Sequence, residues 1–128
     1  MSAEDIPSDA EFFSLEGERN ARISKVYDGD TVHAIFKVGN SYCKFKVRLS
    51  GIDTPEIKTK DADEKKRALE ARDWLHTKVF GKIVTLKCKE FDKYGRLLAD
   101  IICDGTCLNQ KMIDLNLGYA YDGGTKKK

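Results

Sequence analysis

Seven polar residues of the chain fall at the ends of expected strands or in the loops beside them. They are Asp28, Asp30, Arg48, Asp53, Thr54, Glu56 and Arg96. Carboxylates that gather in one place repel each other unless a hard cation joins them, and oxygen ligands favour calcium or magnesium over zinc. Arginines beside such a cluster offer planar forks that grip phosphate oxygens. The set therefore indicates metal-assisted phosphoryl transfer, in which a carboxylate positions or deprotonates water.

Each of these short motifs, taken singly, also has an ordinary structural interpretation. The Asp-Gly-Asp at 28–30 is typical of a hairpin turn, and the Asp-Thr-Pro-Glu at 53–56 is typical of a turn or a helix cap. The Tyr-Gly-Arg at 94–96 resembles an ordinary hairpin tip, and Arg48 could be a solvent-facing strand residue. The chemical interpretation therefore depends on whether the folded chain brings these residues together.

The elements that must position these residues follow from the spacing of apolar side chains. Period-two alternation predicts five strands, over 23–27, 31–38, 42–49, 82–91 and 97–103. Helical spacing predicts a helix over 62–80 and a short helix over 108–117. This order predicts an α+β, mainly β fold: an OB-type five-stranded antiparallel barrel with a helix between strands 3 and 4 and a short C-terminal helix. In such a barrel the first hairpin turn and the polar loop 50–61 can lie at one end.

Composition is typical of one globular domain. The chain has 128 residues, of which 41% are hydrophobic and 34% are charged, so disordered and low-complexity classes are excluded. Residues 1–20 hold six acids and one arginine, and we interpret them as an acidic N-terminal arm. We expect residues 21–121 to form the OB domain and residues 122–128 to form a flexible lysine-rich tail. Outside the acidic arm the chain is modestly basic, which suits a polyanionic partner.

Three segments resemble the signatures of the staphylococcal nuclease-like (thermonuclease) family. They are Val26–Thr31, Arg48–Glu56 and Asp92–Arg96, they occur in that family's order, and a helix of suitable length separates the second from the third. Leu108-Asn109 and the Leu-Gly-Tyr-Ala at 117–120 extend the match. The resemblance covers about residues 21–121 and predicts a nuclease-like OB domain.

The resemblance implies a calcium-dependent phosphodiesterase that hydrolyses DNA and RNA with little sequence preference and leaves 3′-phosphates. One Ca²⁺ per active site would be held by Asp30, Asp53 and the backbone carbonyl of Thr54. The substrate partners would be DNA and RNA. Single strands would be preferred, because a shallow barrel face cannot enter a stacked duplex without distorting it.

The same resemblance assigns roles to five further residues. Glu56 would hold the attacking water, either as general base or as an orienting group. Arg48 and Arg96 would clamp the scissile phosphate. Tyr94 would stack on, or hydrogen-bond near, the nucleotide beside the cut, and Lys93 would add a phosphate contact.

Two other functions are open from the sequence. One is a non-catalytic nucleic-acid-binding or protein-binding OB module of the same fold, and the other is an OB domain whose acids form a structural cation site. We expect a monomer with no membrane association, because no apolar run is long enough to span a bilayer. The first twenty residues contain no stretch like a secretory signal, so a cytoplasmic or nuclear location is expected.

Overall fold

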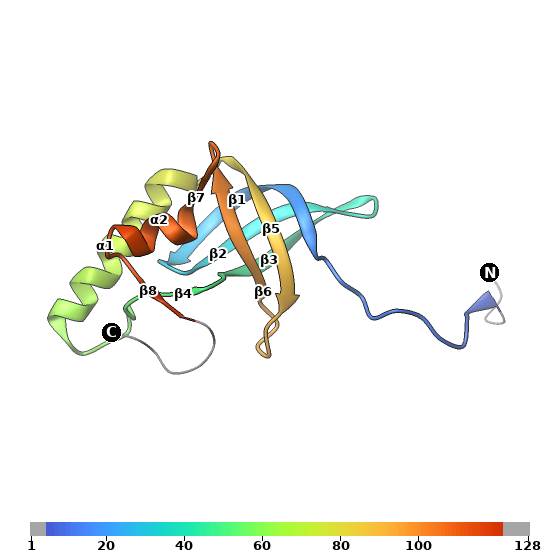
Figure 1. Ribbon diagram of the computed structural model, residues 1–128, viewed down its shortest axis with the longest axis horizontal. Coiled ribbons are helices and arrows are strands. Elements are labelled where there is room, and N and C mark those ends of the chain that lie inside the picture. The colour runs from blue at the N-terminus through green and yellow to red at the C-terminus, as the bar shows by residue number, and fades with distance from the viewer. Residues whose placement is uncertain (1–4, 122–128) are drawn as a thin grey trace.

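Five long strands of the computed structural model, which describes residues 5–121, close into a barrel (Figure 1). They are β1 (Gly17–Asp28), β2 (Thr31–Val38), β3 (Ser41–Leu49), β5 (Ile83–Phe91) and β6 (Leu97–Cys103). Their order is β3-β2-β1-β5-β6, and β3 also pairs with β6. That closing pair is parallel, whereas the other four pairs are antiparallel. The predicted OB-type fold is confirmed. The expected lysine-rich tail over 122–128 lies outside the described residues.

The strands form where apolar and polar residues alternate, because successive side chains of a strand point to opposite faces. On β3, Val47 and Leu49 are buried while Lys44 and Lys46 are exposed. The barrel interior is filled by aliphatic side chains from every long strand together with Phe36. This closed interior gives the loops at the barrel ends a rigid support.

The helix α1 (Ala62–Val79) covers one end of the barrel (Figure 1). Its four buried side chains recur at helical spacing and are Ala68, Ala71, Leu75 and Val79. Asp61 caps its N-terminus, because the Asp61 side chain accepts hydrogen bonds from two free backbone N–H groups of the first turn. Gly81 follows the helix with φ +73°, a conformation that glycine adopts without strain, and leads the chain into β5.

The turn between β1 and β2 is packed tightly against α1 and the segment after β4 (Ile52–Asp53). A Cβ atom at Gly29 would lie 2.8 Å from the Ala71 Cβ and 2.9 Å from the Thr54 Cγ2. Only glycine fits such a close approach. The turn that carries Asp30 is therefore held against the loop that carries Asp53.

Three features differ from the elements predicted above. The first strand begins at Gly17 and not at Ile23, and residues 17–22 pair with β5. The polar loop 50–61 contains β4, which pairs with β8 (Tyr119–Ala120), and β7 (Thr106–Cys107) extends the sheet beyond β6. The C-terminal helix α2 (Leu108–Asp114) ends three residues earlier than predicted. The additional strand pairings form through backbone hydrogen bonds of polar or short segments, so the pattern of apolar residues does not predict them.

Within residues 5–121, no helix is both long enough and apolar enough to cross a lipid bilayer.

Candidate active site

An open cleft of about 1340 Å³ lies where the β1–β2 turn, the loop around β4 and the β5–β6 hairpin come together. It is lined by all eight residues that the sequence nominated for metal binding, catalysis or substrate contact: Asp30, Arg48, Asp53, Thr54, Glu56, Lys93, Tyr94 and Arg96. These residues are spread over more than sixty positions of the chain. The barrel therefore gathers them at one end.

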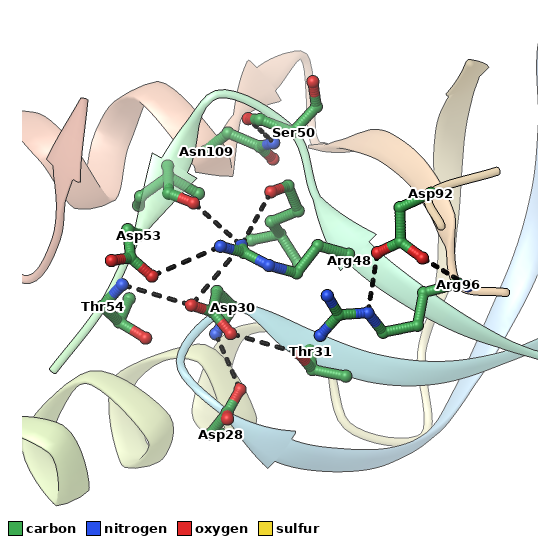
Figure 2. Close-up of polar contacts among 12 residues, drawn as sticks. Asp28, Asp30, Thr31, Arg48, Ser50, Asp53, Thr54, Asp92, Arg96 and Asn109 are labelled. Atoms are coloured by element: carbon green, nitrogen blue, oxygen red, sulfur yellow. Dashed lines mark hydrogen bonds and ion pairs between the residues drawn. The ribbon is translucent and has the colours of Figure 1, made fainter. Parts of the chain in front are cut away.

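The centre of the cleft is an arginine that contacts two carboxylates from different loops (Figure 2). Arg48 Nη1 lies 3.4 Å from Asp30 Oδ2, and Arg48 Nη2 lies 3.3 Å from Asp53 Oδ1. The Arg48 Nη1 group also donates to the backbone carbonyl oxygens of Ile52 (2.8 Å) and Leu49 (3.1 Å). All three charged side chains are only 10–11% exposed. Arg48 is therefore not the solvent-facing strand residue that its position alone permits.

Asp30 is held in place by neighbours on both of its oxygens. The backbone N–H of Thr54 donates to Asp30 Oδ2 (3.2 Å), and the Thr31 hydroxyl donates to Asp30 Oδ1 (3.1 Å). Burial raises the pKa of Asp30, but the positive charge of Arg48, followed by hydrogen bonds that include those from Asp28, Thr54 and Thr31, lowers it below its usual range. Asp30 is therefore ionised at neutral pH.

Asp28 supports Asp30 from the turn before it. Its Oδ1 accepts the backbone N–H of Asp30 (3.1 Å). Burial, and then the negative charge of Asp30, raise the pKa of Asp28 to about 7. Since Asp30 faces Arg48 and Asp28 does not, the proton shared by these two carboxyl groups resides on Asp28.

The donor set suits a hard cation. Two carboxylates, Asp30 and Asp53, face the same guanidinium, so this position already accommodates positive charge. Within residues 5–121, no group of three or more His, Cys, Asp or Glu side chains is placed to hold a metal. Calcium completes six to eight oxygen ligands with backbone carbonyls and water as well as carboxylates. Two carboxylates and a backbone carbonyl such as that of Thr54 are oxygen ligands of the kind that Ca²⁺ takes, and they are poor ligands for zinc.

The second arginine reaches the cleft from the β5–β6 hairpin. Arg96 Nε donates to Asp92 Oδ2 (2.8 Å), while Asp92 Oδ1 accepts the backbone N–H groups of Tyr94 and Arg96 (2.9 Å each). Burial raises the pKa of Asp92, but the backbone hydrogen bond from Arg96 and further contacts lower it overall. Figure 2 shows the Nη groups of Arg96 directed toward Arg48. Asp92 thus orients Arg96 and leaves its fork facing the cleft.

Three of the nominated residues line the cleft nearer to solvent. Glu56 is exposed, and its backbone N–H lies 3.4 Å from Glu64 Oε2. Tyr94 is 71% exposed, with the Arg96 Cζ 5.2 Å and the Lys93 Nζ 5.3 Å from its ring centroid. An exposed aromatic face between two cations suits a nucleotide base next to its phosphate.

One positioning residue has no assigned role in the sequence interpretation. Asn109, at the start of α2, is 4% exposed, and its Nδ2 donates to the carbonyl oxygens of Ser50 (2.8 Å) and Ala99 (3.2 Å). Its Oδ1 accepts the backbone N–H of Ile101 (3.0 Å). Asn109 therefore ties the corner after β3 to β6, and that corner joins the strand that carries Arg48 to β4. A buried amide in an otherwise apolar helix face is the signal that would have found it.

Comparison with known proteins gives a family model, described as Staphylococcal nuclease homologue, that matches residues 46–126. The chain belongs to the staphylococcal nuclease family. The family match includes the positions of Arg48, Asp53, Glu56 and Arg96, and it begins after Asp30.

Several curated relatives share this staphylococcal nuclease region. The protein named Staphylococcal-like nuclease CAN1 from Arabidopsis thaliana is 37% identical over 78 residues, which are 61% of this chain and 22% of that protein. An Uncharacterized endonuclease from Escherichia coli is 31% identical over 104 residues, which are 80% of this chain and 61% of that protein. The chain thus spans between about a fifth and three fifths of the length of these relatives.

Proposed function

We propose that this chain is a calcium-dependent phosphodiesterase that hydrolyses DNA and RNA with little sequence preference and leaves 3′-phosphates. The observation that supports the proposal most strongly is that the carboxylates of Asp30 and Asp53 lie on one cationic group, 3.4 and 3.3 Å from the Nη atoms of Arg48. The Arg96 fork faces the same cleft. Phosphoryl transfer requires a cation held by acidic side chains, and it requires positively charged side chains such as two arginines that bind the phosphate.

The metal ligands in this proposal are the carboxylates of Asp30 and Asp53 and the backbone carbonyl of Thr54. When bound, Ca²⁺ supplies a positive charge that stabilises the negative charge developing on the phosphate oxygens. Asp30 is prepared for this role, because it is ionised at neutral pH and is fixed by hydrogen bonds to both oxygens. Asp53 is held in the buried β4 segment that pairs with β8.

The proposed reaction is an attack of water on phosphorus that displaces the 5′ oxygen. Glu56 holds a water molecule and accepts its proton, or orients it for attack, while the water oxygen forms a bond to phosphorus. The bond from phosphorus to the 5′ oxygen breaks, and that oxygen takes a proton from solvent water and leaves as a hydroxyl. Arg48 and Arg96 neutralise the additional negative charge of the five-coordinate phosphorus.

The experiment that tests this proposal is digestion of single-stranded DNA and RNA in calcium and in excess chelator. We expect digestion in calcium alone, products that end in 3′-phosphate, and faster cutting of single strands than of a GC-rich duplex. Glu56→Gln should lose activity by about 10²-fold or more, the range of a general base. Glu16→Gln is the matched control, because Glu16 is exposed and lies outside the residues that line the cleft.

Three results would each contradict part of this proposal. Digestion that continues in excess chelator would contradict the calcium dependence. Unchanged activity of the Glu56 variant would contradict the role of this carboxylate in catalysis. Binding of nucleic acid without cleavage, equal in calcium and in chelator, would instead support the non-catalytic module.

A further inference from the structure

A row of cationic side chains crosses three barrel strands beside the cleft, outside the residues assigned to catalysis. Lys25 on β1 is paired with His33 on β2, and His33 is paired with Lys46 on β3. Lys44 lies two residues from Lys46 on the same face of β3, paired with Ile35. We call Lys25, His33, Lys44 and Lys46 the lysine strip. Its first, second and fourth members line the cleft, and Lys44 continues the strip beyond it.

The lysine strip has no neutralising partner among residues 5–121. None of its four side chains forms an ion pair with a carboxylate there, and Lys25 Nζ lies instead 5.7 Å from the centroid of the Tyr27 ring. Like charges on neighbouring strands destabilise a sheet. Burial, and then the charges of Lys25, Lys44 and Lys46, lower the pKa of His33, so the three ammonium groups lie close enough to repel an added proton. A bound polyanion would remove this repulsion.

The strip continues the row of side chains that leads to Arg48. Lys44, Lys46 and Arg48 occupy every second position of β3 and so share one face, on which consecutive residues are about 7 Å apart. This spacing suits successive phosphates of an extended single strand. Tyr27, which is 47% exposed and lines the cleft, places an aromatic ring beside Lys25. A cationic track with an adjacent aromatic face is the arrangement by which proteins bind single-stranded nucleic acid.

We propose that the lysine strip binds phosphates of the nucleotides that flank the scissile bond, so that the preferred substrate is a strand running from Arg48 over Lys46 toward Lys44. This inference rests on the proposed nuclease function and specifies its substrate as a polynucleotide. A dinucleotide has a single internucleotide phosphate, so with that phosphate at Arg48 none remains for Lys46 or Lys44.

The test is the salt dependence of binding, measured by fluorescence anisotropy in excess chelator so that no cleavage occurs. The probes are a labelled single-stranded DNA of about 12 nucleotides, a length within the range of one OB fold, and a labelled dinucleotide. In the double variant Lys44→Gln/Lys46→Gln, the slope of log K against log salt should fall by about 1.4, since each phosphate contact on a single strand contributes about 0.7. At 0.1 M salt this corresponds to about a 25-fold loss of affinity for the longer probe.

The matched control is Lys65→Gln/Lys66→Gln, which removes the same charge from exposed positions of α1 outside the cleft lining. It should leave the slope and the affinity for the longer probe within twofold of the unaltered protein. The dinucleotide should bind all three proteins alike, and equal Tm values would establish that the variants are folded. An unchanged slope in the strip variant, an equal loss in the control, or an equal loss for the dinucleotide would each overturn the proposal.

Failure of this inference is distinguishable from failure of the nuclease function. Binding is measured without calcium and without turnover, so an inactive protein can still reveal the strip. Conversely, calcium-dependent digestion that requires Glu56 but is indifferent to Lys44 and Lys46 would leave the proposed function standing and refute the strip alone.

Discussion

Replacing Arg48 with methionine removes the guanidinium that both Asp30 and Asp53 contact, while it keeps an unbranched side chain of similar length. The two ion-pair distances are 3.4 and 3.3 Å, and all three side chains are about nine-tenths buried. Breaking a buried ion pair by removing one partner costs about 3–5 kcal/mol, because it leaves uncompensated charge behind. We therefore expect the free energy of unfolding at pH 7, without calcium, to fall by about that amount.

Arg72→Met is the matched control for this loss. Arg72 pairs with Asp73 at 3.2 Å, but the two side chains are 37% and 68% exposed. Exposed pairs contribute about 0–1 kcal/mol. The contrast between the two arginines therefore measures burial, since the substitution is chemically the same.

The loss in the Arg48 variant should depend on pH and on calcium. The Arg48 charge lowers the pKa of Asp30, so wild type gains stability above the ordinary value of 3.8 and loses it as pH falls through the lowered pKa. Without Arg48 this contribution disappears, and the deficit of the variant should shrink in acid. If Asp30 and Asp53 bind Ca²⁺ as proposed, calcium should stabilise the variant more than wild type, because the ion then supplies the missing charge.

Urea unfolding followed by the fluorescence of Trp74, the single tryptophan, measures these differences. The titrations are run in chelator and in calcium, at neutral pH and at about pH 3, below the ordinary pKa of 3.8 for Asp30. An Arg48 variant that loses no more stability than the Arg72 variant at pH 7 would refute the reasoning. It would mean that the ion pairs with Asp30 and Asp53 contribute as little as an exposed pair.

Two further predictions concern neighbouring groups. Because the pKa of Asp28 is raised to about 7, the folded wild-type protein binds more protons than the unfolded chain between about pH 4 and pH 7. The contribution of Asp28 to the free energy of unfolding therefore falls as pH rises through that range. Asp28→Asn should therefore gain stability relative to wild type from pH 4 to pH 7 in calcium-free urea titrations, and a constant difference would contradict the raised pKa. Arg96→Lys keeps the charge but loses the fork and the Nε–Asp92 bond, so turnover on single-stranded DNA should fall by about 10³-fold or more, as for other arginines in phosphoryl transfer. Turnover of the Arg96→Lys variant near that of wild type would contradict a role of Arg96 in catalysis.

Residue types and local spacing were sufficient for much of the fold, and they nominated residues that the fold gathers in one cleft. The helix α1 was predicted within one residue, because a period of 3.6 is visible along the chain itself. The strands β2 and β6 were predicted with their observed bounds for the corresponding reason. The acids and arginines were nominated because of their residue types, their positions at the ends of expected strands and their places in the motifs that resemble the nuclease family.

The tertiary structure alone decided how these groups meet. The early start of β1 at Gly17 and the β4–β8 pairing depend on backbone hydrogen bonds between distant segments, which side-chain periodicity does not record. Whether Arg48 faced solvent or two buried carboxylates depended on the close approach of Gly29 to Thr54, a contact across 25 positions. A sequence specifies which charges are available, but their pKa values and partners follow from burial and distance, and these exist only in the folded chain.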